Sequence, residues 1–358
     1  MSIIDSQLRS YCTKILLRVK RKIINYLGLV SDQYFYLDSY MKSRREKGVE
    51  RITLYSPSCE VEFITPSNGK LIKNFFLDRY LYKLDKASID PISGFIYDQE
   101  GIFIAESSAW NLLRGFYSWP KPYIKIPKKI LIGDYIFLND IGYGHWLLED
   151  LPAFLAAYKE YPKATVLCPE NPSSFLKYFL NLLDTKILYL NATTCVENLI
   201  MAGKSAGYGH PAHGLSYNPI DIENVREFFK DSISKDETDK FLFVSRLGES
   251  RCPSNILEVE EYVTNRGYSV VNTNLNLNLM DQVQLFSSAK KVVGIHGAAL
   301  MNIVWCNEGT EIVEIFTNDY MPTAFSSISS VRILNYSWFS YGDSCEDSID
   351  ISMLESFL

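Results

Sequence analysis

Strands that alternate with helices between residues 241 and 316 limit the possible folds of this chain more than any other feature. Short apolar runs, typical of buried strands, are separated by longer amphipathic stretches, typical of helices. The expected strands are Phe241–Val244, Ser269–Val271, Val292–Ile295 and Glu311–Phe316, and the expected helices are Asn255–Arg266, Leu279–Ala289 and Ala298–Val304. Strands and helices that alternate in this way form βαβ units, so the sequence predicts an α/β fold with a parallel sheet.

A similar pattern over residues 129–201 predicts a second α/β unit. Lys129–Leu138 is expected to be a strand pair that turns at Gly133-Asp134. The other expected elements are helices at His145–Tyr158 and Ser173–Leu183 and strands at Ala164–Cys168, Lys186–Leu190 and Val196–Met201. We therefore expect two Rossmann-like domains whose parallel sheets face a cleft. Open sheets of this kind bind ligands at the carboxyl ends of their strands.

The predicted division of the chain has four parts. They are a basic amphipathic helical segment (1–30), an N-terminal Rossmann-like domain (31–205), a C-terminal Rossmann-like domain (206–335) and a tail with a final helix (336–358). The stretch from Gly203 to Pro219 is rich in Gly, His and Pro and is the candidate linker. Residues 31–125 contain short β-like runs at Ile52–Tyr55 and Val61–Ile64, but no pattern that indicates a function.

Charge and cysteine content exclude several classes of protein. The 358 residues carry a net charge of −6, which argues against a nucleic-acid partner. Seven cysteines form no C-x-x-C pair, so neither a metal site nor a disulfide framework is expected. No apolar run approaches the roughly 20 residues of a membrane-spanning helix, and basic residues interrupt the first apolar stretch. Reduced thiols and the lack of a signal peptide favour a cytoplasmic location.

The first 30 residues combine a basic face with apolar residues near helical spacing. Six basic side chains against one acidic side chain, Asp5, give this segment a net charge of +5. A helix of this kind can lie on an anionic membrane surface, which would place the protein at the inner face of the membrane. It can equally well pack on its own domain and leave its basic face in solvent, and the sequence does not separate the two alternatives.

Two motifs in the second half suit a diphosphate. In the first, an apolar strand runs into Gly294-Ile-His296-Gly297 and a helix begins at once. Glycines allow close backbone approach, and a helix N-terminus presents free N–H groups with a partial positive charge. In the second, Arg246 and Arg251 follow a strand, and guanidinium groups bind phosphate oxygens in pairs. The alternatives are a tight turn with a packed histidine and two solvated arginines.

Acidic side chains supply two further candidates. His145 and Glu149 are four residues apart, so on a helix they share one face, and their apolar neighbours indicate partial burial. Burial can shift the pKa of a carboxylate so that it acts as a general base. Such a pattern is, however, more common in a capped surface helix with a His–Glu pair. Glu314 lies near a strand end, where a carboxylate can accept hydrogen bonds from ribose hydroxyls; a strand-end Glu is more often simply solvated.

Taken together and in this order, these motifs resemble glycosyltransferase family 61, which includes bacterial capsule-type enzymes. The strongest similarity runs from Phe243 to Phe316, and the whole resemblance covers roughly residues 130–358. The similar segments are Ser245-Arg246, Gln284-Leu-Phe-Ser-Ser-Ala-Lys290, Val293-Gly-Ile-His-Gly-Ala298, Asn302, Gly309-Thr-Glu-Ile-Val-Glu314, His145-Trp-Leu-Leu-Glu-Asp-Leu-Pro152 and Ser348-Ile-Asp-Ile-Ser-Met-Leu354. Glu149 stands where many members have Asp, which leaves open whether Glu149 or Asp150 is the base.

The resemblance implies a GT-B fold, a nucleotide diphosphate sugar donor such as a UDP-sugar, and inversion at the anomeric carbon. The expected acceptor is a glycan or lipid-linked glycan in capsule or surface polysaccharide synthesis. The transferred sugar would be a hexose, an N-acetylhexosamine or a pentose. The expected donor-site residues are Arg246, Arg251, Gly294, His296, Gly297, Ala298, Asn302 and Glu314, and the expected catalytic residues are Glu149, His145 and Asp150.

The sequence contains no D-x-D motif, which metal-dependent transferases commonly use, so we expect neither a metal nor a cofactor beyond the donor. A dinucleotide-dependent oxidoreductase would need G-x-G-x-x-G after a first strand, and this motif is absent. A non-catalytic glycan-binding or scaffold protein on the same fold remains the alternative, because a fold alone does not establish an activity. Loss of both Glu149 and Asp150 would favour that alternative, but both carboxylates are present.

Overall fold

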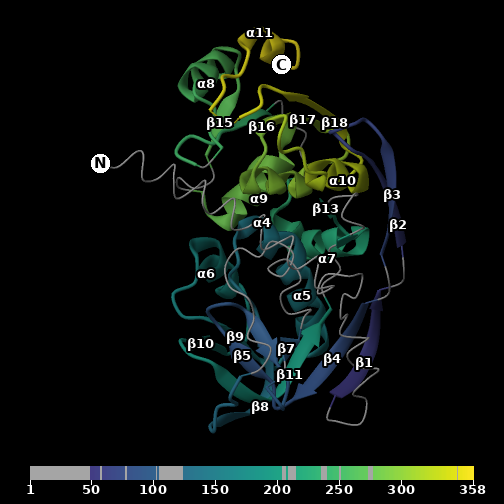
Figure 1. The fold of residues 1–358 in the computed structure, drawn as a ribbon, viewed down its shortest axis with the longest axis vertical. Coiled ribbons are helices and arrows are strands. Elements are labelled where there is room, and N and C mark those ends of the chain that lie inside the picture. The colour runs from purple at the N-terminus through teal and green to yellow at the C-terminus, as the bar shows by residue number, and fades with distance from the viewer. Residues whose placement is uncertain are drawn as a thin grey trace, which may run out of the picture. The chain divides into compact units, whose positions relative to one another are not determined.

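A computed structural model gives the fold of the chain (Figure 1). The structure describes residues 49–56, 59–76, 79–101, 103–104, 124–203, 207–208, 215–234, 240–249, 251–272, 277–344 and 346–358. The basic segment 1–30 and the loop that carries His210 and His213 lie outside the described residues. Within the described residues, no helix combines the length and the apolar character needed to cross a membrane.

The chain divides into two compact units, and all four candidate motifs from the sequence belong to the larger one. This unit consists of Arg51–Tyr82, Asp134–Leu190 and Ile200–Leu358. The smaller unit includes Lys83–Gly133 and Asn191–Leu199.

Five parallel strands form the C-terminal sheet of the larger unit (Figure 1). In spatial order they are β15 (Ser269–Val271), β14 (Lys240–Val244), β16 (Ala289–Ile295), β17 (Glu311–Phe316) and β18 (Asn335–Ser340). The parallel sheet expected from the alternating pattern is therefore confirmed. The sequence interpretation did not include β18, which lies at the edge of the sheet and alternates polar with aromatic residues instead of forming an apolar run.

Helices cover both faces of this sheet, which explains why its strands are almost continuously apolar. Leu242 and Val244 pack into one core with the helix α9 (Leu279–Ser287), while Phe243 packs on the other face with α8 (Ile256–Asn265). The remaining helical segments here are η4 (Ala298–Trp305), α10 (Ala324–Val331) and α11 (Ile351–Glu355). The segment η4 is a 3₁₀ helix, where we expected a short helix at Ala298–Val304.

Local sequence explains where these helices begin and end. The side chain of Asn278 accepts hydrogen bonds from the first turn of α9, and Asp281 reaches back to the Asn278 backbone, which completes a capping box. Helix α8 is followed by Gly267 at φ +87°, a backbone conformation that favours glycine.

A second set of parallel strands precedes this sheet in the larger unit. β8 (Ile130–Phe137), β9 (Thr165–Pro169) and β10 (Ile187–Leu190) are parallel neighbours. They are connected through α4 (Tyr143–His145), the π-helical turn η2 (Trp146–Asp150), α5 (Leu151–Glu160) and α6 (Ser174–Leu180), and α7 (Pro219–Phe228) follows later in the chain. The predicted strand pair at Lys129–Leu138 is wrong, because β8 runs through Gly133-Asp134 without turning. The Gly133 N–H donates to the Glu197 carboxylate instead.

One apolar core joins these helices to the C-terminal sheet. Its largest fully buried side chains include Trp146 from η2, Phe179 from α6 and Trp305 from η4. Phe179 and Phe229 contact at 6.3 Å between ring centroids, and Phe229 contacts Trp305 at 5.2 Å. Side chains from η2, α6 and η4 therefore share one core within the larger unit.

Antiparallel strands make up most of the remaining described structure. In the smaller unit, β11 (Thr194–Ala202), β5 (Ser88–Asp90), β6 (Phe95–Tyr97) and β7 (Phe103–Ile104) are neighbours in that order. In the larger unit, the hairpin of β2 (Cys59–Ile64) and β3 (Leu71–Phe76) packs Val61 and Phe63 against α10. The other strands are β1 (Val49–Ser56), β4 (Arg79–Asp85), β12 (Gly207–Tyr208) and β13 (Leu215–Ser216). Strands β1 and β2 confirm the β-like runs seen in the sequence.

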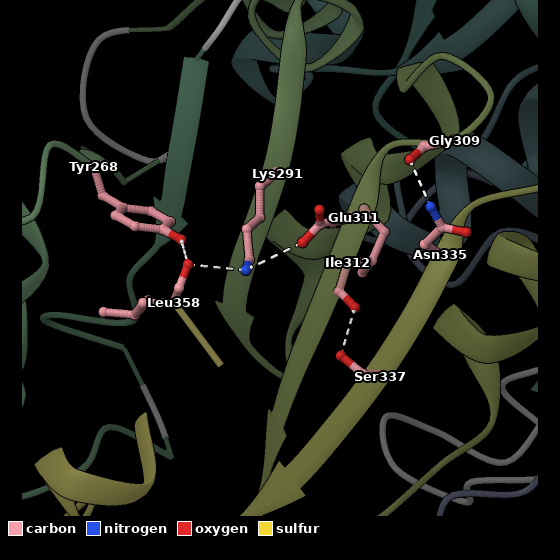
Figure 2. A network of polar contacts seen from close by, with 8 residues as sticks. All are labelled: Tyr268, Lys291, Gly309, Glu311, Ile312, Asn335, Ser337 and Leu358. Atoms are coloured by element: carbon pink, nitrogen blue, oxygen red, sulfur yellow. Dashed lines mark hydrogen bonds and ion pairs between the residues drawn. The ribbon is translucent and has the colours of Figure 1, made fainter. Parts of the chain in front are cut away.

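Polar contacts hold the amino ends of the C-terminal strands (Figure 2). Lys291 Nζ donates to the Leu358 carbonyl at 3.0 Å and lies 3.1 Å from the Glu311 carboxylate. Tyr268 OH donates to the same carbonyl at 3.2 Å. On the neighbouring strand, the Asn335 amide donates to the Gly309 carbonyl at 2.9 Å. This network lies at the amino ends of the strands. Other side chains lie at the carboxyl ends, where ligands are expected.

Candidate active site

The carboxyl ends of three neighbouring strands bring the predicted donor-site residues together. Arg246 follows β14, His296 follows β16, and Glu314 lies on β17. Because the strands are parallel, with Val244 beside Gly294 and Gly294 beside Glu314, these side chains lie at one edge of the sheet. This is the edge at which open α/β sheets bind their ligands.

Arg246 packs directly on the glycine turn. Its Nη1 donates to the His296 carbonyl at 3.1 Å, and its side chain is largely buried. A Cβ added at Gly297 would lie inside the guanidinium group. Gly297 has an extended backbone with φ 174°, which any residue can adopt, so the glycine is needed here for space. The turn therefore holds the guanidinium against the backbone at the start of η4.

A second arginine and a tyrosine complete a cationic cluster. The Arg251 guanidinium lies over the Tyr320 ring, 4.9 Å from its centroid, and Tyr320 also contacts the His296 ring edge-on at 5.3 Å. Burial, and then the proximity of Arg251, lower the pKa of Arg246. A binding site that holds two guanidinium groups this close favours an anionic ligand, because the anion offsets their mutual repulsion.

His296 is held by a buried acid. Its Nδ1 lies 2.5 Å from Glu314 Oε1, and Tyr336 OH donates to Glu314 Oε2 at 2.6 Å. Glu314 is 0% exposed, and burial raises its pKa well above the usual range, against the opposite effect of the Tyr336 hydrogen bond. Both carboxylate oxygens of Glu314 thus have partners inside the protein. The expected contact of Glu314 with ribose stays a prediction, and the structure adds a contact with His296 that we did not expect.

The other residues expected near the donor occupy different positions. Gly294 is a packing glycine, because a Cβ there would lie 2.8 Å from Leu300 Cδ1 and 2.9 Å from Val244 Cβ. Ala298 is exposed at the start of η4, whose first N–H groups lack intrahelical acceptors. Asn302 is fully buried: its amide donates to Gln282 at 2.9 Å and accepts from Tyr143 and Trp305. A direct ligand contact for Asn302 therefore stays a prediction.

The predicted base residues lie on the π-helical turn η2. His145 Nδ1 lies 2.6 Å from Glu149 Oε1, which confirms the pairing predicted from their spacing. The side chains are 22% and 1% exposed, so His145 reaches solvent and Glu149 lies behind it. Asp150 is also buried. Single π-turns inside helices occur frequently at functional sites, and this one carries both the Glu149 that pairs with His145 and the buried Asp150.

The helix that carries this pair lies against the start of η4. A Cβ at Gly144 would lie 3.2 Å from Met301 Cε and 3.8 Å from Ala298 Cα. Tyr143 OH donates to Asn302 Oδ1 at 2.5 Å. Sequence reasoning did not identify Tyr143, Tyr320 or Tyr336. The only local signal for Tyr143 is its position beside Gly144 at the start of the motif.

One compact unit thus contains two arginines, a histidine paired with an acid, and a neighbouring His–Glu pair. A comparison with known protein families adds information about the chemistry of these residues. Residues 143–313 match the family model Glycosyltransferase 61. The matched range begins at Tyr143, at the start of α4, contains the His145–Glu149 pair, Arg246, Arg251 and His296, and ends one residue before Glu314. It supports the resemblance to glycosyltransferase family 61 and, with it, glycosyltransferase activity. Comparison with the curated proteins found no match.

Proposed function

We propose that this chain is an inverting glycosyltransferase that moves a sugar from a UDP-sugar to a hydroxyl group of a glycan or lipid-linked glycan. The observation that carries the proposal is the convergence of Arg246, Arg251 and His296 on one strand-end turn, within the range that matches glycosyltransferase family 61. An anionic ligand is the natural occupant of that turn. In the proposed reaction, the nucleotide diphosphate is both the recognised group and the leaving group.

The leaving diphosphate gains negative charge as the glycosidic bond to it breaks. Fixed cations and N–H groups that already point at this charge stabilise the transition state without reorganisation. Arg246, Arg251, His296 and the first N–H groups of η4 would supply this stabilisation. Inversion then requires one base that removes the proton from the acceptor hydroxyl on the opposite side of the sugar.

The His145–Glu149 pair is the proposed base. His145 is the more exposed member, so its remaining nitrogen meets the acceptor hydroxyl, while Glu149 accepts the Nδ1 hydrogen and stabilises the imidazolium that forms. The hydroxyl oxygen attacks the anomeric carbon, its proton passes to His145, and the bond to the diphosphate breaks. The packing of Gly144 on η4 supports this division of roles, because it keeps the base helix beside the donor turn.

We further propose a GT-B arrangement for the two sets of parallel strands and a role in capsule or surface polysaccharide synthesis at the cytoplasmic side of a membrane. Residues 1–30 would provide peripheral contact with anionic lipid. The transferred group would be a hexose, an N-acetylhexosamine or a pentose. The competing function is a glycan-binding scaffold with the same fold, which would retain the sugar contacts and lack turnover.

A panel of nucleotide sugars tests the proposed function. We expect one donor to support transfer to a glycan acceptor and slow hydrolysis without acceptor. In a thermal-shift assay, the corresponding nucleotide diphosphate should raise the Tm, because a ligand that binds only the folded state stabilises it. Stabilisation by NAD instead would indicate an oxidoreductase. A scaffold would show neither donor turnover nor stabilisation by nucleotides.

Metal chelation gives a separate prediction. Within the described residues, no group of three or more His, Cys, Asp or Glu side chains is arranged to hold a metal ion. Because arginines and His296 are proposed to stabilise the leaving group, we expect transfer to continue at an unchanged rate in excess EDTA. Activity that disappears with EDTA and returns in proportion to added Mg²⁺ or Mn²⁺ would contradict the proposed mechanism.

The Gly297→Ala substitution tests the geometry of the turn. The added methyl group would displace the Arg246 guanidinium from the His296 carbonyl, so we expect UDP affinity to fall by about tenfold, the contribution of one charge-assisted hydrogen bond. Calorimetric titration with UDP provides the measurement. Gly248→Ala is the control for protein stability. Open space surrounds that position, so the added methyl group meets no neighbour, but the backbone φ of +82° strains an alanine there. Equal UDP affinities for wild type and Gly297→Ala would show that the turn does not position Arg246.

A further inference from the structure

Three polar side chains from neighbouring parts of the C-terminal sheet form a chain of contacts centred on the fully buried Glu314. His296 follows β16, Glu314 lies on β17, and Tyr336 lies on β18. The two contacts, at 2.5 Å and 2.6 Å, use both oxygens of Glu314. Only the His296 end belongs to the proposed diphosphate site. Through these two contacts, Tyr336 and Glu314 act on a bound diphosphate by way of the histidine.

The contact between Glu314 and His296 must contain a hydrogen. A carboxylate oxygen and an unprotonated ring nitrogen are both acceptors, and two acceptors would repel each other at 2.5 Å. Tyr336 cannot receive this hydrogen. Burial, and then the Glu314 carboxylate, raise the pKa of Tyr336 far above its ordinary value, so the phenol stays protonated and always donates.

In the empty site, the shared hydrogen belongs on the acid. Burial raises the pKa of Glu314 well above its usual range, because a carboxylate charge is costly in a fully buried position. Positive charge on His296 is disfavoured as well, since the Arg246 guanidinium lies on its carbonyl and Arg251 lies over the adjoining Tyr320 ring. The His296 ring also contacts the apolar rings of Phe316 and Phe325.

A bound diphosphate reverses this balance. Its negative charge offsets the two guanidinium groups and favours positive charge on the imidazole. The hydrogen can then move from Glu314 Oε1 to His296 Nδ1, where it forms an N–H bond, leaving a carboxylate and an imidazolium. Tyr336 stabilises the carboxylate through Oε2. No proton enters or leaves the protein, so this step requires no proton exchange with solvent.

We propose that Glu314 stores a proton for His296, and that donor binding moves this proton onto the ring so that His296 meets the diphosphate as a cation. Tyr336 is the positioning residue that makes the carboxylate state accessible. The inference rests on the proposed function, because its ligand is the donor diphosphate. The charged and titratable groups that face the pair include Arg246 after β14, Arg251 and Tyr320 beside the ring, and Tyr336 on β18.

The test follows the ring nitrogens directly, in the full chain labelled with ¹⁵N-histidine. The sequence has four histidines, and the His296→Gln variant identifies the His296 signals. At pH 8 without ligand, we expect His296 to show one protonated and one unprotonated nitrogen. Saturating UDP should give the signature of an imidazolium, with both nitrogens protonated. Calorimetry in two buffers of different ionisation enthalpy should give the same binding enthalpy, because no proton is exchanged.

Variants separate the roles of the two partners. In Glu314→Gln the amide cannot release a proton, so UDP affinity at pH 8 should fall by about five- to tenfold, the difference between a charge-assisted and a neutral hydrogen bond. This loss should shrink as the pH falls toward 6, where solvent protonates an ordinary imidazole. Tyr336→Phe should lower affinity in the same range and keep His296 neutral with UDP bound. Ser337→Ala, on the same strand, should behave as wild type.

Several results would overturn the inference. If His296 is an imidazolium before UDP is added, or stays neutral after UDP binds to the wild type, no proton is transferred. If wild-type binding takes up a proton from the buffer, the proton comes from solvent and not from Glu314. A chain that binds none of UDP, ADP, GDP and CDP would overturn the proposed function along with the inference. UDP binding with unchanged His296 signals would overturn the inference alone.

Discussion

Replacing Glu149 with glutamine is expected to lower turnover by about 10²–10⁴-fold, the usual contribution of a general base, and to leave UDP affinity unchanged. Glu149 is buried and lies 2.6 Å from the His145 ring. The amide has nearly the same shape, so the fold should persist, but it cannot stabilise the imidazolium that forms when His145 takes the acceptor proton. Initial rates with saturating donor and acceptor measure turnover, and calorimetry measures UDP binding separately.

Asp150→Asn is the matched comparison, since it makes the same chemical change at the next residue. Asp150 lies one position further around the π-turn, and His145 pairs with Glu149, so we expect a smaller loss. Normal turnover in Glu149→Gln with an inactive Asp150→Asn would make Asp150, and not Glu149, the carboxylate on which the base depends. If both variants stay active, the base lies elsewhere. The candidates would then be His145 acting alone, or His210 and His213 in the loop outside the described residues.

The strands and helices that local pattern predicted well are those with an apolar core on both sides. The strand at Phe241–Val244 was predicted because Leu242 and Phe243 are buried on opposite faces of the sheet and both are apolar. The edge strand Asn335–Ser340 was missed, since it needs fewer apolar residues. The turn predicted at Gly133 failed for a different reason. Gly-Asp is a common turn pair, but its N–H is bound by a glutamate 64 residues away.

The same distinction applies to the site. We could predict that Arg246 and His296 lie together because each follows the carboxyl end of a strand in the same parallel sheet. This prediction requires only the positions of the strands and the end at which each residue lies. The partners that orient them were not predictable in this way. Tyr143 and Asn302 are separated by 159 residues, and Tyr336 lies on the strand that the sequence did not reveal. Glu314 seemed suited to ribose because the sequence gives its position on a strand, but not its burial.

Arg246→Ala and His296→Ala are each expected to lower UDP affinity by about 10- to 100-fold, since charge-assisted hydrogen bonds contribute about 1.5–3 kcal/mol each. Calorimetric titration with UDP measures the loss. Arg246→Lys keeps the charge without the paired N–H geometry, so it should lose less than Arg246→Ala. Arg266→Ala removes the same charge from an exposed arginine at the end of α8, and it should bind UDP as the wild type does.

The double variant distinguishes a shared site from two independent contacts. Arg246 Nη1 donates to the His296 carbonyl, so each side chain supports the position of the other. Neighbouring residues that act on one ligand are not additive, and we expect the double variant to lose less affinity than the product of the two single losses. Losses that multiply would mean that the two side chains bind UDP separately. Unchanged affinity in both single variants, with folding intact, would remove the diphosphate from this turn altogether.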